Sequence, residues 1–304
     1  MSSLAYAWRS LWRNRRRTLI TLTAIALSIM LVQAFHNLSV GVYAQMIDDG
    51  VRAGSGHLAV YRDGYLDGRE ETVSFAPENL TQRLRAIPGV KAALPRLYLP
   101  ALAQSSHDSR GILLVGVEPA AERAVNPFLK ELPEDGMPRD AGGRDAVIGK
   151  RLLDDLRLDI GRKLVVTAQH RDGTLHSELL RVRGVVATGI ADVDGSLLMV
   201  GIERAALLAG MPGEIHELAI VLDNADDERR VLPALAALAG SRPELAAVSW
   251  EKAMPNLANA IKLDYASQKF IFVIILLIVT IGVVNTLLMS VMERLREFGV
   301  VLAL

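Results

Sequence analysis

A glycine-containing stretch at residues 142–151, Gly-Gly-Arg-Asp-Ala-Val-Ile-Gly-Lys-Arg, comes closest to a nucleotide-binding motif. A phosphate-binding loop needs a glycine, four further residues, then Gly-Lys followed by Ser or Thr, because its backbone amides cradle phosphate and its hydroxyl holds Mg²⁺. Here Arg144 stands in place of the first glycine and Arg151 in place of the hydroxyl. The stretch therefore predicts no nucleotide site.

Asp192, Asp194 and Glu203 have the spacing of positions 1, 3 and 12 of a calcium-binding loop. Leu197 occupies the position that requires glycine, and residues 197–200 have the composition of a strand. We therefore expect a polar turn there.

His170 and His176 face each other across a predicted hairpin, but the sequence offers them no obvious carboxylate partner. A solvated edge is the favoured interpretation, with metal binding as the alternative.

The sequence contains few residues or motifs for other kinds of catalysis or cofactor binding. The chain has no cysteine, which excludes disulfides, thiolate zinc sites and cysteine nucleophiles. No Ser-His-Asp set, pair of carboxylates or cofactor motif stands out, so we expect a protein that is not an enzyme, with no metal and no cofactor.

The composition of the chain is strongly apolar. Hydrophobic residues make up 51% of the 304 residues and charged residues only 22%, which favours a membrane protein. Of 34 acidic residues, all but Glu293 and Glu297 lie between His36 and Gln268, where only 26 of the 34 basic residues lie. This balance excludes a globally basic nucleic-acid binder.

Two uncharged runs, residues 18–35 and 270–292, are long enough to cross a bilayer core of about 30 Å as helices. Five arginines precede the first run and Asp48-Asp49 follow it, so the positive-inside rule places both termini in the cytoplasm. The first run could instead belong to a signal peptide, but its length and its helical continuation favour an uncleaved span. Within residues 1–17, Trp8 and Trp12 share one helical face, which predicts an interfacial amphipathic helix; a plain positive flank is the alternative.

Both apolar stripes continue past the membrane, over residues 36–55 and 251–269. We expect these segments to pair as a helical stalk, with one stripe packing against the other. The stripes consist of Phe35, Leu38 and Val42 on the first segment and Leu257, Ile261 and Tyr265 on the second. In the second span, Gly282, Asn285 and Thr286 predict close packing on other helices. Small residues let another helix approach closely, and a buried amide needs a hydrogen-bond partner. The alternative is that Asn285 forms its hydrogen bonds within its own helix.

Residues 56–250 alternate short strand and helix patterns, which predicts a two-lobed α+β domain outside the cytoplasm. Strands are expected at residues 57–62, 111–117, 163–170, 176–187, 197–200, 216–223 and 245–250, and helices at 78–87, 146–156, 203–210 and 228–240. Asp172-Gly173 predicts the tight turn of a hairpin. The fold class is thus an integral membrane protein with two spans, N-in and C-in, flanking this domain.

The whole chain resembles the extracytoplasmic-domain permeases of ATP-binding-cassette systems, the FtsX-like or MacB-type superfamily. The likeness rests on "WRNRRRT" near the start, "GSGHLAVYRDGYLD" after the first span and "NTLLMSVMERLREFGVVLAL" at the end. The family's coupling-helix pattern E-R-x-R-E-x-G is matched over residues 293–304 by Glu293, Arg294, Arg296, Glu297 and Gly299, with Phe298 before the glycine. The form "GSGHLAVYRDGY" is nearer to the lipoprotein-releasing branch than to the macrolide exporters.

The resemblance implies a multi-pass inner-membrane permease with its large domain in the periplasm. It implies a separate cytoplasmic ABC ATPase docked on the charged segment, a second permease copy or paralogue as dimer partner, and contact with membrane lipids. Transport would proceed by mechanotransmission, with a lipoprotein or another hydrophobic envelope molecule as cargo. Family members continue with two further spans, so the resemblance also implies C-terminal truncation and puts autonomous function in doubt.

Two alternatives share the same layout. A two-span receptor would need a signalling helix after the second span, and we expect a turn at Phe298-Gly299 instead. A cell-division-type regulator would use the same fold to activate an envelope hydrolase.

Overall fold

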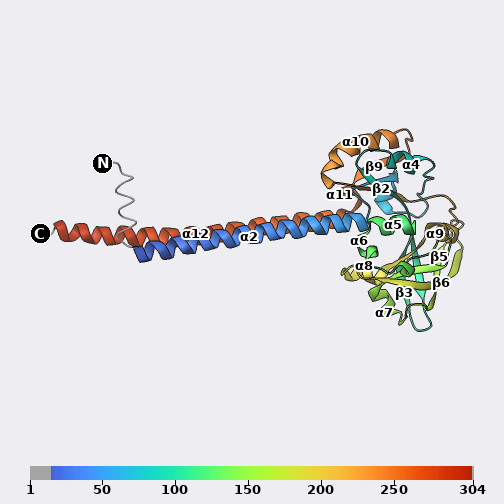
Figure 1. Cartoon of the computed structure of the whole chain (residues 1–304), viewed down its shortest axis with the longest axis horizontal. Helices are drawn as coiled ribbons and strands as arrows, with labels where there is room; N and C mark the ends of the chain where they lie inside the picture. The colour runs from blue at the N-terminus through green and yellow to red at the C-terminus, as the bar shows by residue number, and fades with distance from the viewer. Residues whose placement is uncertain (1–14, 303–304) are drawn as a thin grey trace. The chain divides into compact units, whose positions relative to one another are not determined.

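The computed structural model describes residues 15–302 of the chain (Figure 1). The interfacial helix expected over residues 1–17 lies, apart from residues 15–17, outside the described part. The described chain divides into two compact units, a helical unit of residues 15–45 and 259–302 and a sheet domain of residues 46–258. Each is described in turn.

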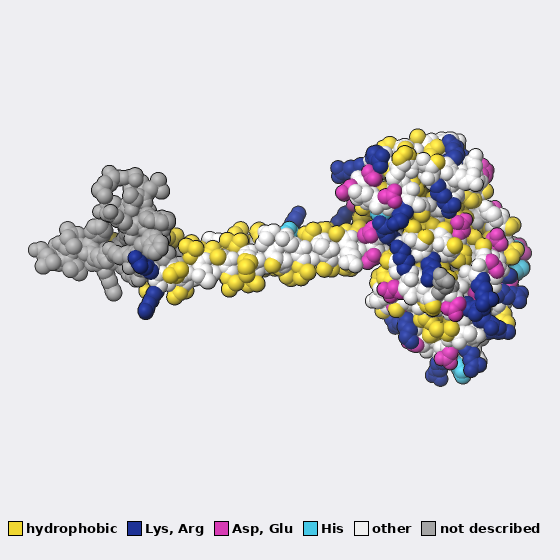
Figure 2. Space-filling view, viewed as in Figure 1, with side chains coloured by type: hydrophobic (Ala, Val, Ile, Leu, Met, Phe, Trp, Pro, Cys, Tyr) yellow, Lys and Arg dark blue, Asp and Glu magenta, His cyan; other side chains and the backbone are white. Residues whose placement is uncertain are grey.

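The helical unit is built from two long helices, α2 (Arg15–Ala53) and α12 (Pro255–Leu302), which run side by side (Figure 1). The segments Ile25–Ala53 and Pro255–Met289 are long and apolar enough to cross a membrane. At a rise of about 1.5 Å per residue, each helix is longer than a bilayer core of about 30 Å. Figure 2 shows apolar side chains exposed along both helices, as a lipid-facing surface requires.

The sheet domain contains a nine-stranded sheet in the order β3-β7-β4-β6-β5-β2-β8-β1-β9. The strands are β1 Leu58–Arg62, β2 Val90–Gln104, β3 Ser109–Val117, β4 Asp145–Gly149, β5 Lys163–Gln169, β6 Leu175–Val186, β7 Leu197–Gly201, β8 Glu217–Leu222 and β9 Leu245–Ser249. The helices are α3 Tyr65–Gly68, α4 Leu80–Arg85, α5 Pro119–Val125, α6 Pro127–Lys130, α7 Lys150–Asp155, α8 Ala191–Ser196, α9 Ile202–Ala209, α10 Glu228–Ala239 and α11 Trp250–Ala253, with 3-10 turns η1 Glu134–Gly136 and η2 Ala225–Asp227.

Strand β2 divides the sheet domain into two lobes. Its residues 96–104 pair with β3, and the pairs β3–β7, β7–β4, β4–β6, β6–β5 and β5–β2 then close a ring of strands. We call this ring the barrel lobe. Residues 90–96 of β2 pair instead with β8, which continues through β1 to β9; we call this the split lobe.

Each lobe has its own core. The barrel lobe is filled by alternate strand residues such as Leu97, Ile148 and Leu164, with α7 and α9 contributing further apolar side chains. The split lobe packs Leu84 of α4 and Leu235 of α10 against the strands, and Figure 1 shows these helices at that end of the domain. The two-lobed α+β architecture expected from the sequence is therefore confirmed.

The local patterns placed most elements correctly, and two departures have physical causes. Residues 146–149, expected as the start of a helix, form β4, because they are buried between β6 and β7; only the following segment is helical. The long strand β2 was not among the expected strands, and it contains Pro95 and Pro100. Both prolines lie where β2 has a ladder partner on one side only, and such edge positions tolerate a residue that lacks an N–H group.

Candidate functional site: a buried ionic junction at the end of helix α2

The residues proposed to dock on an ATPase, from Glu293 to Gly299, lie in α12. The turn expected at Phe298-Gly299 is wrong, because the backbone stays helical to Leu302. One glycine in a helix costs only about 1 kcal/mol relative to alanine, and the neighbouring glutamates and arginines are good helix formers. The docking role of this segment stays a prediction.

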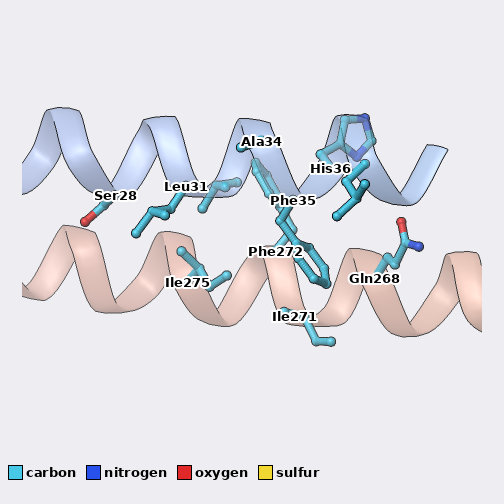
Figure 3. A pocket seen from close by; sticks show the side chains of 11 residues that line it. Ser28, Leu31, Ala34, Phe35, His36, Gln268, Ile271, Phe272 and Ile275 are labelled. Carbon is cyan, nitrogen blue, oxygen red and sulfur yellow. The ribbon is translucent and has the colours of Figure 1, made fainter. Parts of the chain in front are cut away.

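The expected pairing of the two stalk stripes stays a prediction, although the helices that carry them do lie side by side. The Tyr43 and Tyr265 rings lie 5.9 Å apart between centroids, so α2 and α12 do pair inside the helical unit. Phe35 and Leu38, however, line a groove together with Phe272 rather than with residues near Ile261 (Figure 3). Phe35, Leu38 and Val42 remain largely exposed.

Leu257 belongs to the sheet domain, where its side chain lies close to Gly50 of α2: a Cβ added at Gly50 would lie 3.2 Å from the leucine side chain. The expected packing of Leu257 on Phe35, Leu38 or Val42 stays a prediction. In the second span Asn285 is exposed, and the packing of Gly282, Asn285 and Thr286 on further helices stays a prediction.

The near-motifs have local structural roles. Asp194 accepts hydrogen bonds from the Thr188 amide and hydroxyl, both at 2.8 Å, and so fixes the turn before α8. Lys150 at the start of α7 ion-pairs with Asp154 at 2.9 Å. Neither arrangement favours calcium or nucleotide binding.

The most unusual polar cluster was not expected from the sequence and centres on Arg96 of β2. This residue is 2% exposed and stands where β2 passes from the split lobe to the barrel lobe. Its guanidinium donates to both carboxylate oxygens of Glu122 on α5, at 2.6 and 3.2 Å, and to the carbonyl of Gly54 directly after α2. Arg96 thus joins the C-terminal end of α2 to both lobes.

A second buried acid completes the cluster. Glu217 of β8 lies with its Oε1 3.8 Å from Nη1 of Arg96, and its Oε2 accepts from the Ser55 hydroxyl at 3.4 Å. The Tyr61 hydroxyl in turn donates to Ser55 at 3.1 Å. We call Gly54, Ser55, Arg96, Glu122 and Glu217 the ionic junction.

Burial sets the protonation behaviour of the ionic junction. Burial raises the pKa of Glu217, although Arg96 opposes this. Burial by itself lowers the pKa of Arg96, but Glu122, Tyr98 and Glu217 outweigh it and raise that pKa. The guanidinium therefore stays charged, and a buried cation facing two acids and a helix-end carbonyl is held in one arrangement.

Two buried histidines lie near the junction. Nδ1 of His57 accepts from the Leu222 amide at 3.2 Å, while its Nε2 faces Asp48 on α2 at 3.6 Å. Nδ1 of His216 accepts from the Tyr98 amide at 3.0 Å, and its ring stacks on Tyr65. Burial is the main cause that lowers the pKa of both histidines, so both are neutral at pH 7.

The ionic junction offers structural coupling rather than catalysis. Its groups bond one another, and no arrangement of nucleophile, base and oxyanion donors is present among them. The sequence carries one signal for it: a single arginine in the apolar stretch Ala-Leu-Pro-Arg-Leu-Tyr-Leu-Pro at residues 93–100. A buried arginine requires acidic or carbonyl partners, and those partners came from segments far away along the chain.

Comparison with known proteins supplies a family. Residues 18–238 match the model of the MacB-like periplasmic core domain. Among curated proteins, the chain is 26% identical over 249 residues to the lipoprotein-releasing system transmembrane protein LolC of Neisseria meningitidis serogroup B, covering 78% of this chain. The chain spans 57% of that relative's length.

Two solved structures align with part of this chain. The periplasmic region of MacB from Actinobacillus actinomycetemcomitans aligns with a TM-score of 0.48 at 12% identity, covering 69% of this chain and 96% of that one. The extracellular domain of the ABC-type transporter YknZ from Gram-positive bacteria aligns with a TM-score of 0.43 at 17% identity, covering 63% and 99%.

Proposed function

The chain belongs to the MacB-like periplasmic core domain family of ABC transporter permeases, and from this premise we propose that it couples ATP hydrolysis in the cytoplasm to work in the periplasm. A separate cytoplasmic ATPase would hydrolyse ATP. The chain would pass the resulting motion through α2 and α12 to the sheet domain. The observation that carries this proposal is the family match over residues 18–238, which includes most of the sheet domain and most of α2.

The charge distribution supports the orientation that coupling needs. The arginines at residues 9–17 precede the apolar part of α2, and Arg294 and Arg296 follow that of α12. Positive residues favour the cytoplasmic side, so both helix ends would face the ATPase while the sheet domain would lie in the periplasm. The protein would then be a multi-pass component of the inner membrane.

The ionic junction supports mechanical transmission. Helix α2 is unbroken from Arg15 to Ala53, and the next carbonyl is bound by Arg96 of β2. Because β2 takes part in both lobes, a displacement of this helix end acts on the strand that the lobes share. Such a contact is suited to passing a push or a rotation onward.

A lipoprotein is the cargo we propose. The name of the LolC relative supports this choice, and the groove in the helical unit is compatible with it. The groove has a volume of about 600 Å³ and is lined mostly by apolar side chains of α2 and α12, among them Leu31, Phe35 and Phe272 (Figure 3). Acyl chains bind to such surfaces through the hydrophobic effect. A dimer with a second copy or a paralogue is part of the proposal.

The ATPase contact can be tested by reversing charges in the segment after the second span. In the complete permease, Arg294→Glu and Glu297→Arg should each reduce co-purification of the ABC ATPase, because interface charges set register and partner choice. Glu131→Arg, on an exposed position of the sheet domain, is the matched control and should leave co-purification unchanged. Unchanged co-purification in both test variants would remove this segment from the interface.

A further inference from the structure

The hairpin of β5 and β6 brings two imidazoles and a carboxylate together at its turn. The His170 and His176 rings stack with their centroids 4.3 Å apart. Asp172, in the turn itself, places Oδ1 3.1 Å from Nδ1 of His170. The three residues can each offer one ligand atom, and these atoms all lie within 4.8 Å of one another. The carboxylate that the sequence pattern did not supply is thus provided by the turn.

The surroundings prepare the carboxylate for a cation. The Thr174 amide and hydroxyl donate to Oδ1 of Asp172 at 2.9 and 2.5 Å. These bonds fix the Asp172 carboxylate in the turn, beside the His170 ring. The guanidinium of the adjacent Arg171 ion-pairs with Glu214 at 2.8 Å and so has an acidic partner other than Asp172.

The position of His170 is also determined by its neighbours. Gly210 follows α9 with a φ of +70°, and a Cβ added there would overlap the His170 ring close to Nε2. Only glycine therefore permits the ring to lie against this backbone, with Nε2 on the glycine side and Nδ1 next to Asp172. The nitrogen beside the carboxylate is the one we assign as the ligand.

We propose that His170, Asp172 and His176 form a binding site for a divalent transition-metal ion, with Zn²⁺ as the probe of choice. Two imidazoles and a carboxylate suit zinc, copper or nickel, whereas calcium and magnesium prefer oxygen ligands alone. At metal–ligand distances of about 2.0–2.2 Å, tetrahedral ligand atoms lie roughly 3.3 Å apart. His176 is exposed on its strand, so turning its side chain closes the remaining separation. Three protein ligands leave one position for water or a partner's side chain.

The test is a titration of the metal-free full chain in detergent with Zn²⁺, followed by isothermal calorimetry and without a histidine tag. We expect one ion per chain and weaker binding at pH 5.5 than at pH 7.5, because protons compete for imidazole. His176→Ala and Asp172→Asn should each weaken binding by roughly tenfold or more. Asparagine keeps an oxygen for the Thr174 bonds, so this variant removes the ligand charge without removing the turn.

His107→Ala is the matched control, since His107 is an exposed histidine on the β2–β3 hairpin. It should bind Zn²⁺ as the parent does. Absence of saturable binding in the parent overturns the site, as does equal affinity of the parent and the His170→Ala/His176→Ala double variant. Because the readout is binding of the metal alone, it is independent of any transport function.

Discussion

Removing the Arg96 guanidinium tests the ionic junction most sharply. Arg96→Met retains much of the side-chain volume but leaves Glu122, which is 1% exposed, without its cation. Among the described residues, the side-chain amide of Asn126 would still donate to that carboxylate at 3.3 Å. Breaking one side of a buried pair in this way costs about 3–5 kcal/mol. Glu217 contributes less, because burial raises its pKa and it can take up a proton.

A second variant separates the charge from the packing. Arg96→Met/Glu122→Gln removes the unpaired charge of Glu122, so we expect about half of the lost stability to return, since replacing a buried pair by neutral groups is often close to neutral. The coupling energy between the two positions should then exceed about 1.5 kcal/mol, within the range for residues in direct contact. Glu131→Gln, on the exposed surface, serves as the control and should change stability by less than about 0.5 kcal/mol.

The assay is urea unfolding of the full chain in detergent, followed by tryptophan fluorescence. The chain has three tryptophans, and replacing Trp8 and Trp12 with phenylalanine leaves Trp250 as the reporter in the sheet domain. Two-state unfolding of that domain gives the free energies directly. A loss below about 1 kcal/mol in Arg96→Met, or additive effects in the double variant, would refute the reasoning about a buried and coupled junction.

Three further predictions concern pH, topology and the long helices. Burial lowers the pKa of His57 in the folded state, so below about pH 6.5 the unfolded chain binds more protons than the folded chain does. The free energy of unfolding should therefore fall as the pH drops below about 6.5, by up to about 1.4 kcal/mol per pH unit for this group. His57→Asn should reduce that slope in urea titrations between about pH 7.5 and 5.5. A phosphatase inserted at Asp172-Gly173 should be active only outside the cytoplasm, and a fluorescent protein after Gly299 should fold only inside, as the arginine asymmetry requires. Ile261→Pro should distort α12 at a local cost of about 3 kcal/mol or more and abolish cargo release in the complete permease, while sheet-domain unfolding by Trp250 stays unchanged.

Each of these has a clear contrary result. An unchanged pH slope in His57→Asn would mean that the histidine is not held neutral by burial. Reporter activity on the opposite side at either position would reverse the topology. Full cargo release by Ile261→Pro, with Ile261→Ala as the matched control, would show that continuity of α12 is not needed for transmission.

Features encoded by short segments were predictable from the sequence. The hairpin at Asp172-Gly173 formed where expected, because this turn needs a residue with positive φ and Gly173 has a φ of +86°. The long apolar runs likewise predicted helices, since no polar residue interrupts their period. These features depend on neighbours within a few residues.

Features that depend on distant partners were not predictable in the same way. Strand β2 is stabilised by β3, β5 and β8, and these ladders override the local effect of Pro95 and Pro100. The ionic junction brings together residues from the end of α2, β2, α5 and β8, so no single stretch of the sequence predicts it. The register of α2 on α12 could not be predicted from the sequence for a related reason, because two apolar stripes can pair at several offsets.

The family match, rather than the expected turn, now distinguishes this chain from a two-span receptor. From the sequence, a turn at Phe298-Gly299 argued against a signalling helix, but α12 is continuous to Leu302. The family match over residues 18–238 replaces that argument, since it identifies the sheet domain itself. Helical continuity leaves the charged segment, residues 293–299, on the end of the same helix that crosses the membrane in our proposal.

The central claim is that the chain converts ATP hydrolysis by a separate ATPase into release of a lipid-anchored cargo. The measurement that tests it most directly is cargo release from proteoliposomes containing the complete permease, the ATPase and a fluorescent acylated lipoprotein. We predict release that requires ATP and the permease together and that is lost in Glu297→Arg while Glu131→Arg behaves as the parent. Release that proceeds without the permease, or at the parental rate in Glu297→Arg, would contradict the account.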